Sequence, residues 1–155
     1  MRKRTNRKVW PLVNPIAHVL EGMADTPKDL LDKLRMRELS AIESFRMGRA
    51  HLQDWEDMNA VLNLCETMAR GGVGPEALPA CALAQAELLS AAKRFEGTKR
   101  MGLTAQGLEA FRHLCEWHDL QRQSIPRGDY EKWIKKTGDR VRSKSPEVVD
   151  VAEYA

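Results

Sequence analysis

The sequence predicts an all-α protein, built as an antiparallel bundle of four main helices followed by a basic fifth helix. Three observations support this prediction. Apolar residues recur at three- and four-residue spacing along four long stretches, which is the period of an amphipathic helix. Capping residues, glycines and prolines separate these stretches by short connections, as in antiparallel bundles. Val and Ile are few and do not alternate with polar residues, so no β-strand is expected.

The first helix is expected over residues 27–49. Thr26 is a favourable N-cap, and Pro27 is well tolerated at the first helical position. Apolar positions then recur at helical spacing, at Leu31, Leu34, Ile42 and Phe45. The charged residues between them are expected to face water; these are Arg35, Arg37, Glu38 and Glu43.

The second helix has the most regular apolar pattern in the chain. Asp54 is expected to begin it, because acidic residues in a first turn interact favourably with the helix dipole. Gly71 and Gly72 are expected to end it, since glycine adopts the left-handed cap conformation without a Cβ clash. The apolar stripe between these ends consists of Trp55, Met58, Val61, Leu62, Cys65, Met68 and Ala69.

The third helix has two possible starts, because Pro79 would break a helix that began much earlier. Either a first turn over residues 75–78 precedes a kink, or the helix begins near Leu78. Its body is rich in alanine, which allows neighbouring helices to approach closely. Thr104 is the expected cap of the fourth helix, which reaches about Gln123.

A break at residues 125–128 precedes the shorter fifth helix, which is expected to begin at Asp129 and to pack across the bundle or project from it. Its expected apolar face consists of Tyr130, Trp133, Ile134 and Val141. The chain therefore divides into a flexible basic arm over residues 1–25, a helical bundle domain over residues 26–142 and a flexible tail over residues 143–155.

Length and composition favour a single cytoplasmic domain. The chain has 155 residues, a net charge of +3 and an odd number of cysteines far apart in sequence. These cysteines form no disulfide framework, which fits a reducing compartment. No apolar run approaches the 18 residues typical of a membrane span, and the basic N-terminus is not followed by the apolar stretch of a signal peptide. No membrane association is expected.

Two interpretations of the cysteines stay open. Cys115 and His118 lie three residues apart on one helix, and Cys65 and Cys81 would complete a zinc site of three cysteines and one histidine. The favoured interpretation is that the thiols pack as small apolar groups. No serine or cysteine nucleophile accompanies a histidine in a recognisable pattern. We therefore expect neither a metal, nor a cofactor, nor enzymatic activity.

Two basic regions are candidate contacts with nucleic acid or with a partner protein. The first consists of Arg2, Lys3, Arg4, Arg7 and Lys8, with Trp10 beside it. The second lies in residues 127–144 and includes Lys132, Lys135, Lys136 and Arg140. Basic side chains neutralise phosphates, and aromatic rings such as Trp10, Tyr130 and Trp133 stack on bases. The alternative is that both regions are solvated surfaces.

Asn59 and Asn63 form a further candidate contact. They lie four residues apart, on one side of the second helix. Side-chain amides favour caps and turns over helix interiors, so two of them in one helix suggest a buried polar contact or a partner surface. Ordinary exposure to solvent is the alternative. Homo-oligomerisation is also open, with candidate contacts at Trp10, Trp117, Val148, Val149 and Val151.

Three segments resemble small helical proteins encoded on prophages and integrative elements of Gram-negative proteobacteria. They are VNPIAH (residues 13–18), ESFRMGRAHLQDWEDMNAVLNLCE (43–66) and the helix over residues 108–123. This group has no agreed activity, so the resemblance assigns no catalytic residue. It implies an accessory protein of a mobile element that acts by binding in the bacterial cytoplasm.

The resulting hypothesis is a non-enzymatic interaction protein of a mobile element. By analogy with other accessory proteins of this kind, it would inhibit a host defence or nucleic-acid-handling complex. The alternative is a DNA- or RNA-binding accessory factor that uses the basic arm and the basic fifth helix.

Overall fold

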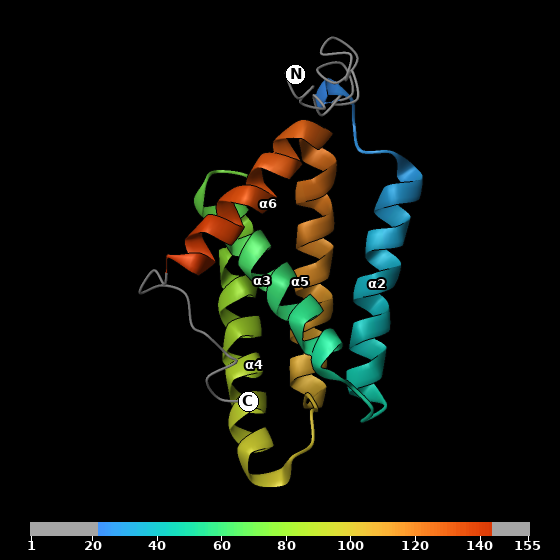
Figure 1. Ribbon diagram of the computed structural model, residues 1–155, viewed down its shortest axis with the longest axis vertical. Helices are drawn as coiled ribbons and strands as arrows, with labels where there is room; N and C mark the ends of the chain where they lie inside the picture. The colour runs from blue at the N-terminus through green and yellow to red at the C-terminus, as the bar shows by residue number, and fades with distance from the viewer. Residues whose placement is uncertain (1–21, 144–155) are drawn as a thin grey trace, which may run out of the picture.

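A computed structural model describes residues 22–143, which form five α-helices around one core (Figure 1). The helices are α2 (Lys28–Arg46), α3 (Leu52–Arg70), α4 (Leu78–Thr98), α5 (Ala105–Ser124) and α6 (Arg127–Arg142). Helices α2 to α5 form a four-helix bundle, and α6 lies across one end of it. No strand occurs in this part of the chain. The all-α prediction is therefore confirmed.

Helix α3 begins at Leu52, two residues before the expected start at Asp54. The reason is local capping, since the backbone N–H of His51 donates to Oδ2 of Asp54 at 2.8 Å. The Asp54 carboxylate thus belongs to the first turn and satisfies a backbone donor just before the helix, as in a capping box. Helix α5 begins as expected, with Thr104 Oγ1 accepting the backbone N–H of Gly107 at 3.0 Å.

The two alternatives for the third helix resolve into a turn followed by a helix. Residues Pro75–Ala77 form a 3₁₀ turn, and α4 begins directly after it at Leu78. Pro79 therefore lies in the first turn of α4, where a missing N–H costs no helical hydrogen bond. Helix α2 ends at Arg46, shorter than expected, and α6 begins at Arg127, two residues earlier than expected.

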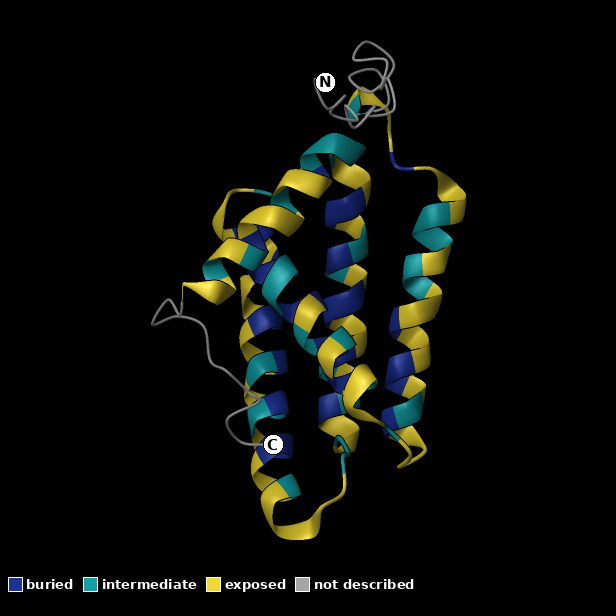
Figure 2. Cartoon of the chain, viewed as in Figure 1, coloured by how far each residue is buried: buried dark blue, intermediate teal, exposed yellow. Residues whose placement is uncertain are grey.

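The core lies between α2, α3, α4 and α5, whose buried residues face one another (Figure 2). Small residues dominate the contribution of α4, which is why it packs closely against its neighbours. The core members from α4 are Ala84, Leu88, Ala91 and Ala92, with Cys81 near its start. Larger side chains from the facing helices fill the space between them; these include Ile42, Phe45, Trp55, Met58, Phe111 and Leu114.

Helix α6 packs across α3 and does not project from the bundle. The ring of Trp133 lies directly against Gly71, where a Cβ would overlap it. Tyr130 points inward and is buried. The expected apolar face is only partly buried, because 48% of Ile134 and 38% of Val141 remain exposed.

The start of the described chain lies beside the start of α6. Asp25 and Pro126 form an isolated antiparallel bridge, and the backbone N–H of Arg127 donates to the carbonyl of Ala24 at 3.0 Å. Gly128 approaches Gly22 so closely that a Cβ would meet its backbone. The segment before α2 is thereby attached to the α5–α6 junction.

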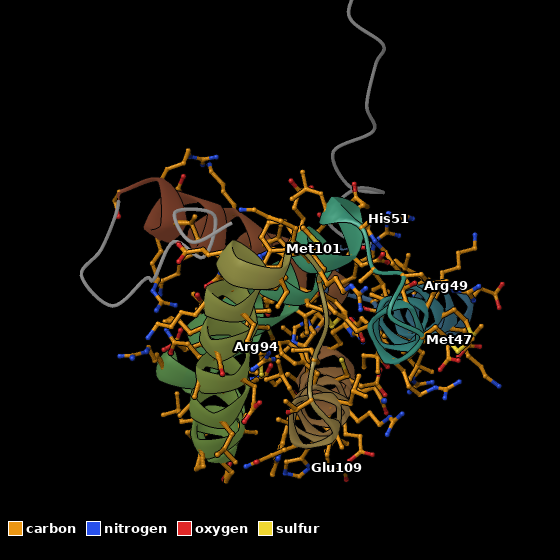
Figure 3. The ribbon with its side chains drawn as sticks, turned by 90° about the horizontal axis from the view of Figure 1, so that it is seen from below. Met47, Arg49, His51, Arg94, Met101 and Glu109 are labelled. Carbon is orange, nitrogen blue, oxygen red and sulfur yellow. The ribbon has the colours of Figure 1, made fainter. Side chains whose placement is uncertain are left out.

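The opposite end of the bundle carries the α2–α3 and α4–α5 connections (Figure 3). Arg94, near the end of α4, binds the α4–α5 connection by donating to the carbonyl of Gly102 at 3.3 Å. It also donates to Ser90 Oγ, one turn earlier in α4, at 2.9 Å. Arg49 and His51 lie on the other connection and are exposed. Within residues 22–143, no helix combines the length and the apolar character needed to cross a membrane.

Candidate functional site

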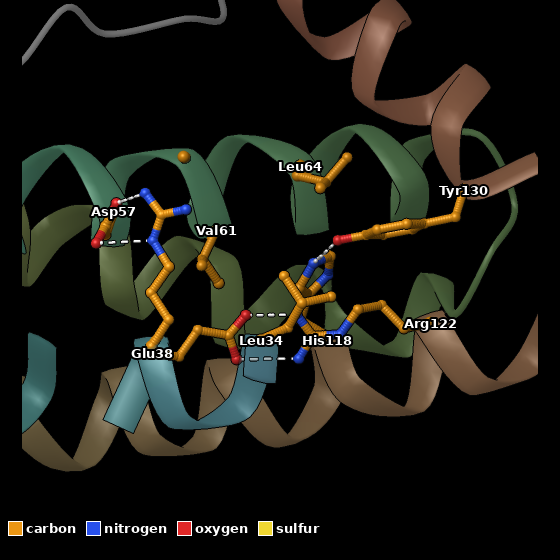
Figure 4. A pocket seen from close by; sticks show the side chains of 10 residues that line it. Leu34, Glu38, Asp57, Val61, Leu64, His118, Arg122 and Tyr130 are labelled. Carbon is orange, nitrogen blue, oxygen red and sulfur yellow. Dashed lines mark hydrogen bonds and ion pairs between the residues drawn. The ribbon is translucent and has the colours of Figure 1, made fainter. Parts of the chain in front are cut away.

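A pocket of about 150 Å³ opens between α2 and α3, with Tyr130 of α6 at one end (Figure 4). Its walls are mainly apolar and include Leu34, Val61 and Leu64. Its floor is polar and consists of Glu38, His118, Arg122 and Tyr130, all of which are buried.

Glu38 and Arg122 form a buried ion pair between α2 and α5. Arg122 donates from Nη1 and Nη2 to the two carboxylate oxygens of Glu38, at 2.5 and 3.0 Å. The expectation that Glu38 faces water is therefore wrong, since only 5% of it is exposed. Burial raises the pKa of Glu38, and Arg122 opposes this shift. The carboxylate of Glu38 in turn raises the pKa of Arg122 against the effect of burial.

Two further ion pairs attach α2 to its neighbours. Arg35 binds Asp119 of α5, whose carboxylate also accepts from Arg122 at 3.4 Å. Arg37 donates to Asp57 of α3, with Nη2 at 2.5 Å and Nε at 3.1 Å from its carboxylate oxygens. Both residues line the pocket, and Asp57 lies at the end away from Tyr130 (Figure 4). The Arg37–Asp57 pair forms a polar, partly exposed rim.

The hydrogen bonds of Gln121 determine which atoms donate and which accept in a buried series of hydrogen bonds from Gln121 through His118 to Tyr130. Its amide nitrogen donates to the carbonyls of Cys65 and Val73, at 3.1 and 2.8 Å. Its oxygen therefore faces Nδ1 of His118, 3.0 Å away, so this nitrogen carries the proton. Nε2 of His118 is then the acceptor for the hydroxyl of Tyr130, at 3.2 Å.

This series of hydrogen bonds keeps His118 neutral. Burial is the main cause that lowers its pKa, to about 4, and the nearby Arg122 charge acts in the same direction. Both ring nitrogens already have partners, so the imidazole has no free position for a substrate proton. The network instead connects α3, α5, α6 and the turn after α3. Its chemistry is that of a hydrogen-bonded polar floor beneath an apolar pocket, in which Nε of Arg122 is buried without a hydrogen-bond partner.

The four residues of the zinc alternative do not assemble into a site. Cys65 and Cys81 are in contact, with Sγ atoms 3.6 Å apart, but both nitrogens of His118 are occupied by Gln121 and Tyr130. In residues 22–143, no group of three or more His, Cys, Asp or Glu side chains has a geometry suited to a metal ion.

The predicted contacts on α6 have different environments. Arg140 is largely buried and binds Glu66 at 3.1 Å and Thr67 at 2.8 Å, so it holds α6 on α3. Lys132 forms an exposed ion pair with Asp129 at 3.1 Å. Lys136 and Lys135 are both exposed. Nζ of Lys136 lies 4.6 Å from the centre of the ring of Trp133.

Asn59 and Asn63 are half-buried on α3 and bond to each other, with Nδ2 of Asn63 3.3 Å from Oδ1 of Asn59. They do not line the pocket. The basic arm and its tryptophan lie outside the described residues; these are Arg2, Lys3, Arg4, Arg7, Lys8 and Trp10. The candidate contacts Val148, Val149 and Val151 lie outside them as well.

The sequence interpretation did not place Glu38, Gln121 or Arg122 in a site. A signal was nevertheless present, because Glu38 lies four residues after Leu34 and four before Ile42, within the apolar stripe of its helix. Arg122 likewise follows His118 by four residues. A charged residue at a stripe position indicates a buried pair. Comparisons of the chain with protein-family models, with curated proteins and with solved structures found no match.

Proposed function

We propose that this protein is a non-enzymatic interaction protein that binds one large apolar side chain of a partner protein in the α2–α3 pocket. The observation that supports this proposal is an open apolar pocket over a polar floor whose side chains, apart from Nε of Arg122, are already hydrogen-bonded. Such a floor does not need to rearrange when a ligand enters, which lowers the entropic cost of binding.

The size of the pocket favours a side chain over a small-molecule ligand. A volume of about 150 Å³ suits a single aromatic ring. Pockets for drug-sized ligands range from roughly 300 to 1,000 Å³. Interfaces between proteins commonly place one aromatic or aliphatic anchor in such a pocket, surrounded by a polar rim. The Arg37–Asp57 pair supplies a rim of this kind.

An adjacent apolar residue extends the proposed surface along α6. Ile134 lies one helical turn after Tyr130 and is half exposed. A partner anchored in the pocket would meet it next. The resemblance to proteins of mobile elements suggests that the partner belongs to the host, and inhibition of a defence or nucleic-acid-handling complex is the corresponding biological role.

We rank direct nucleic-acid binding second, because much of the basic charge on α6 has an acidic partner within the protein. Arg140 is bound to Glu66, and Lys132 is bound to Asp129. Arg142 pairs with Asp139 at 2.6 Å. Phosphate binding needs cations that are free to exchange counterions.

The proposal is tested by filling the pocket. In the full chain, Leu64→Trp should occupy the space between α2 and α3, and Leu83→Trp, on the exposed surface of α4, is the matched control. Indole is the probe, and its binding is measured by changes in amide chemical shifts. Saturable shifts should centre on Val61 and Tyr130 in the wild type and in Leu83→Trp, and should be lost in Leu64→Trp.

The same variants test for the partner. Affinity purification of the tagged full chain from a proteobacterial host should recover a protein with the wild type and with Leu83→Trp, but not with Leu64→Trp. Recovery that is equal for all three chains would contradict a role for the pocket. Absence of saturable indole shifts in the wild type would contradict its ability to hold an aromatic ring.

A further inference from the structure

Two of the three cysteines form a buried pair at the interface between α3 and α4. Sγ of Cys65 and Sγ of Cys81 are 3.6 Å apart, and both residues are almost completely buried. They lie on different helices, 16 residues apart in sequence. Cys115 is also buried, on α5, but has no sulfur–sulfur contact.

We propose that Cys65 and Cys81 form an intramolecular disulfide when the protein meets a hydroperoxide, so that the α3–α4 interface is a site of reversible oxidative modification. A disulfide has an S–S length of about 2.05 Å, so the two sulfurs must approach by roughly 1.5 Å. Rotation of the two Cys side chains and a small movement of the helices would provide this approach. The proposal is independent of the function assigned to the pocket.

The chemistry needs one molecule of hydroperoxide for each disulfide. The thiolate of Cys81 attacks the peroxide oxygen, which breaks the O–O bond and gives a sulfenic acid and a molecule of water or alcohol. The sulfur of Cys65 then attacks Sγ of Cys81, the S–S bond forms and the hydroxyl leaves as water. The two sulfurs are each oxidised by one electron, and the peroxide is reduced by two.

The geometry favours Cys81 as the sulfur that reacts first. It lies in the first turn of α4, directly after the Pro75–Ala77 turn, whereas Cys65 lies further inside its helix, five residues before the end of α3. We expect local opening to expose Cys81 more readily. The hydrogen-bonding contact between the two sulfurs is the main cause that lowers the pKa of Cys81. Burial raises the pKa of Cys115, which leaves that thiol less reactive.

The disulfide would close a loop that α5 and α6 both contact. Residues 65–81 include Gly71, beneath the ring of Trp133, and Val73, whose carbonyl binds Gln121. Oxidation would therefore fix the surface on which α6 packs. A thiol reductant would release it.

The test uses the reduced full chain treated with hydrogen peroxide, then denatured, alkylated and mapped by mass spectrometry. We expect the loss of two hydrogen atoms, a cross-link between the peptides of Cys65 and Cys81, and alkylation of Cys115 alone. Cys115→Ser should still form the cross-link. Cys65→Ser and Cys81→Ser should not form it.

Limited access to the buried sulfurs is controlled by repeating the reaction in urea below the unfolding transition, where local opening is more frequent. Oxidation of Met36, which is 65% exposed, shows that the peroxide has acted. The proposal is overturned if Met36 is oxidised while all three thiols stay alkylatable under both conditions. A cross-link that contains Cys115, or sulfinic acid without a cross-link, would overturn it equally.

Discussion

The fold strongly affects the ionisation of His118. This residue is buried, its Nδ1 proton is donated to Gln121, and its Nε2 accepts the hydroxyl of Tyr130. Protonation of Nε2 would remove that acceptor and place a positive charge close to Arg122. The folded protein therefore holds the imidazole in its neutral form.

This arrangement predicts a stability that depends on pH. The pKa of His118 falls from its ordinary 6.5 to about 4 in the folded protein. As the pH falls from 6.5 towards 4, the unfolded chain takes up a proton that the folded chain refuses, so the free energy of unfolding decreases. The expected loss is up to about 3 kcal/mol. Glu38 acts in the opposite direction, because burial raises its pKa and the folded state takes up that proton more readily.

The contribution of His118 is isolated by urea unfolding of His118→Gln and of the wild type at several pH values between 4 and 7. The variant should lose less stability on acidification than the wild type. His113→Gln, at an exposed position on α5, should keep the wild-type dependence. If His118→Gln and the wild type lose stability in parallel, His118 is not the group responsible.

At the scale of single residues, the sequence indicated apolar positions better than polar ones. Phe111, Leu114 and His118 lie on the same buried side of their helix, as the spacing predicts. Glu38 was expected to face water because charged side chains are rarely buried. Its partner Arg122 lies 84 residues away in sequence. The position of Glu38 in an apolar stripe indicates a buried pair, but the identity of its partner is visible only once the helices are placed together.

Among the elements, α6 packs closely against one glycine at the end of α3. Gly71 has a φ of −84°, so an alanine there would meet no backbone strain. Its Cβ would overlap the ring of Trp133. Gly71→Ala is therefore expected to displace α6 and to lower the free energy of unfolding by about 1–3 kcal/mol, as overpacking does. The measurement is chemical unfolding, followed by tryptophan fluorescence.

Two variants test the cause of this effect. Gly97→Ala lies in α4 with nothing near the new Cβ, so it should preserve or slightly increase stability. The double variant with Gly71→Ala and Trp133→Leu should recover part of the loss, because the smaller side chain leaves room for the methyl group. If Gly71→Ala lowers the free energy of unfolding equally in the wild type and in Trp133→Leu, the alanine does not act by disturbing the ring of Trp133.

Helices were predictable as elements, but their ends only in part, since capping starts α3 two residues before the expected Asp54, and α2 has Pro27 and not Thr26 as its N-cap. Thr104 caps α5 as the sequence indicates, and Pro79 lies in the first turn of α4. The sequence left open whether the fifth helix packs or projects. Its placement depends on the contact between Trp133 and Gly71 and on the bond from Arg140 to Glu66. Neither contact has a signal in local periodicity.

At the scale of the whole molecule, the Glu38–Arg122 pair joins α2 to α5. Glu38→Gln keeps the shape of the side chain but removes the carboxylate that binds both terminal nitrogens of the buried guanidinium, leaving only Asp119, 3.4 Å away, as a counter-charge. The expected loss is about 3–5 kcal/mol in the free energy of unfolding. Glu43→Gln, which disturbs only the exposed pair with Arg46, should leave stability almost unchanged.

Thermal and urea unfolding of both variants give the comparison. A loss in Glu38→Gln that is no larger than the loss in Glu43→Gln would mean that the buried pair is electrostatically unimportant.

The bundle architecture was predictable from periodicity and short connections. The pocket was not, because its lining comes from four helices and its floor from residues that the local pattern does not bring together.

The separation in sequence between Glu38 of α2 and Arg122 of α5 also affects the order in which the contacts between helices form. Each of the helices α2 to α5 meets the next across a short connection, whereas Glu38 and Arg122 join α2 to α5 by closing a loop of more than 80 residues. The entropic cost of closure grows with loop length, so contacts between adjacent helices form more readily. We therefore expect the contacts between adjacent helices to form first and the contact between α2 and α5 to form late. The pocket is then complete only after that last step, since its floor includes Glu38 of α2 and Arg122 of α5.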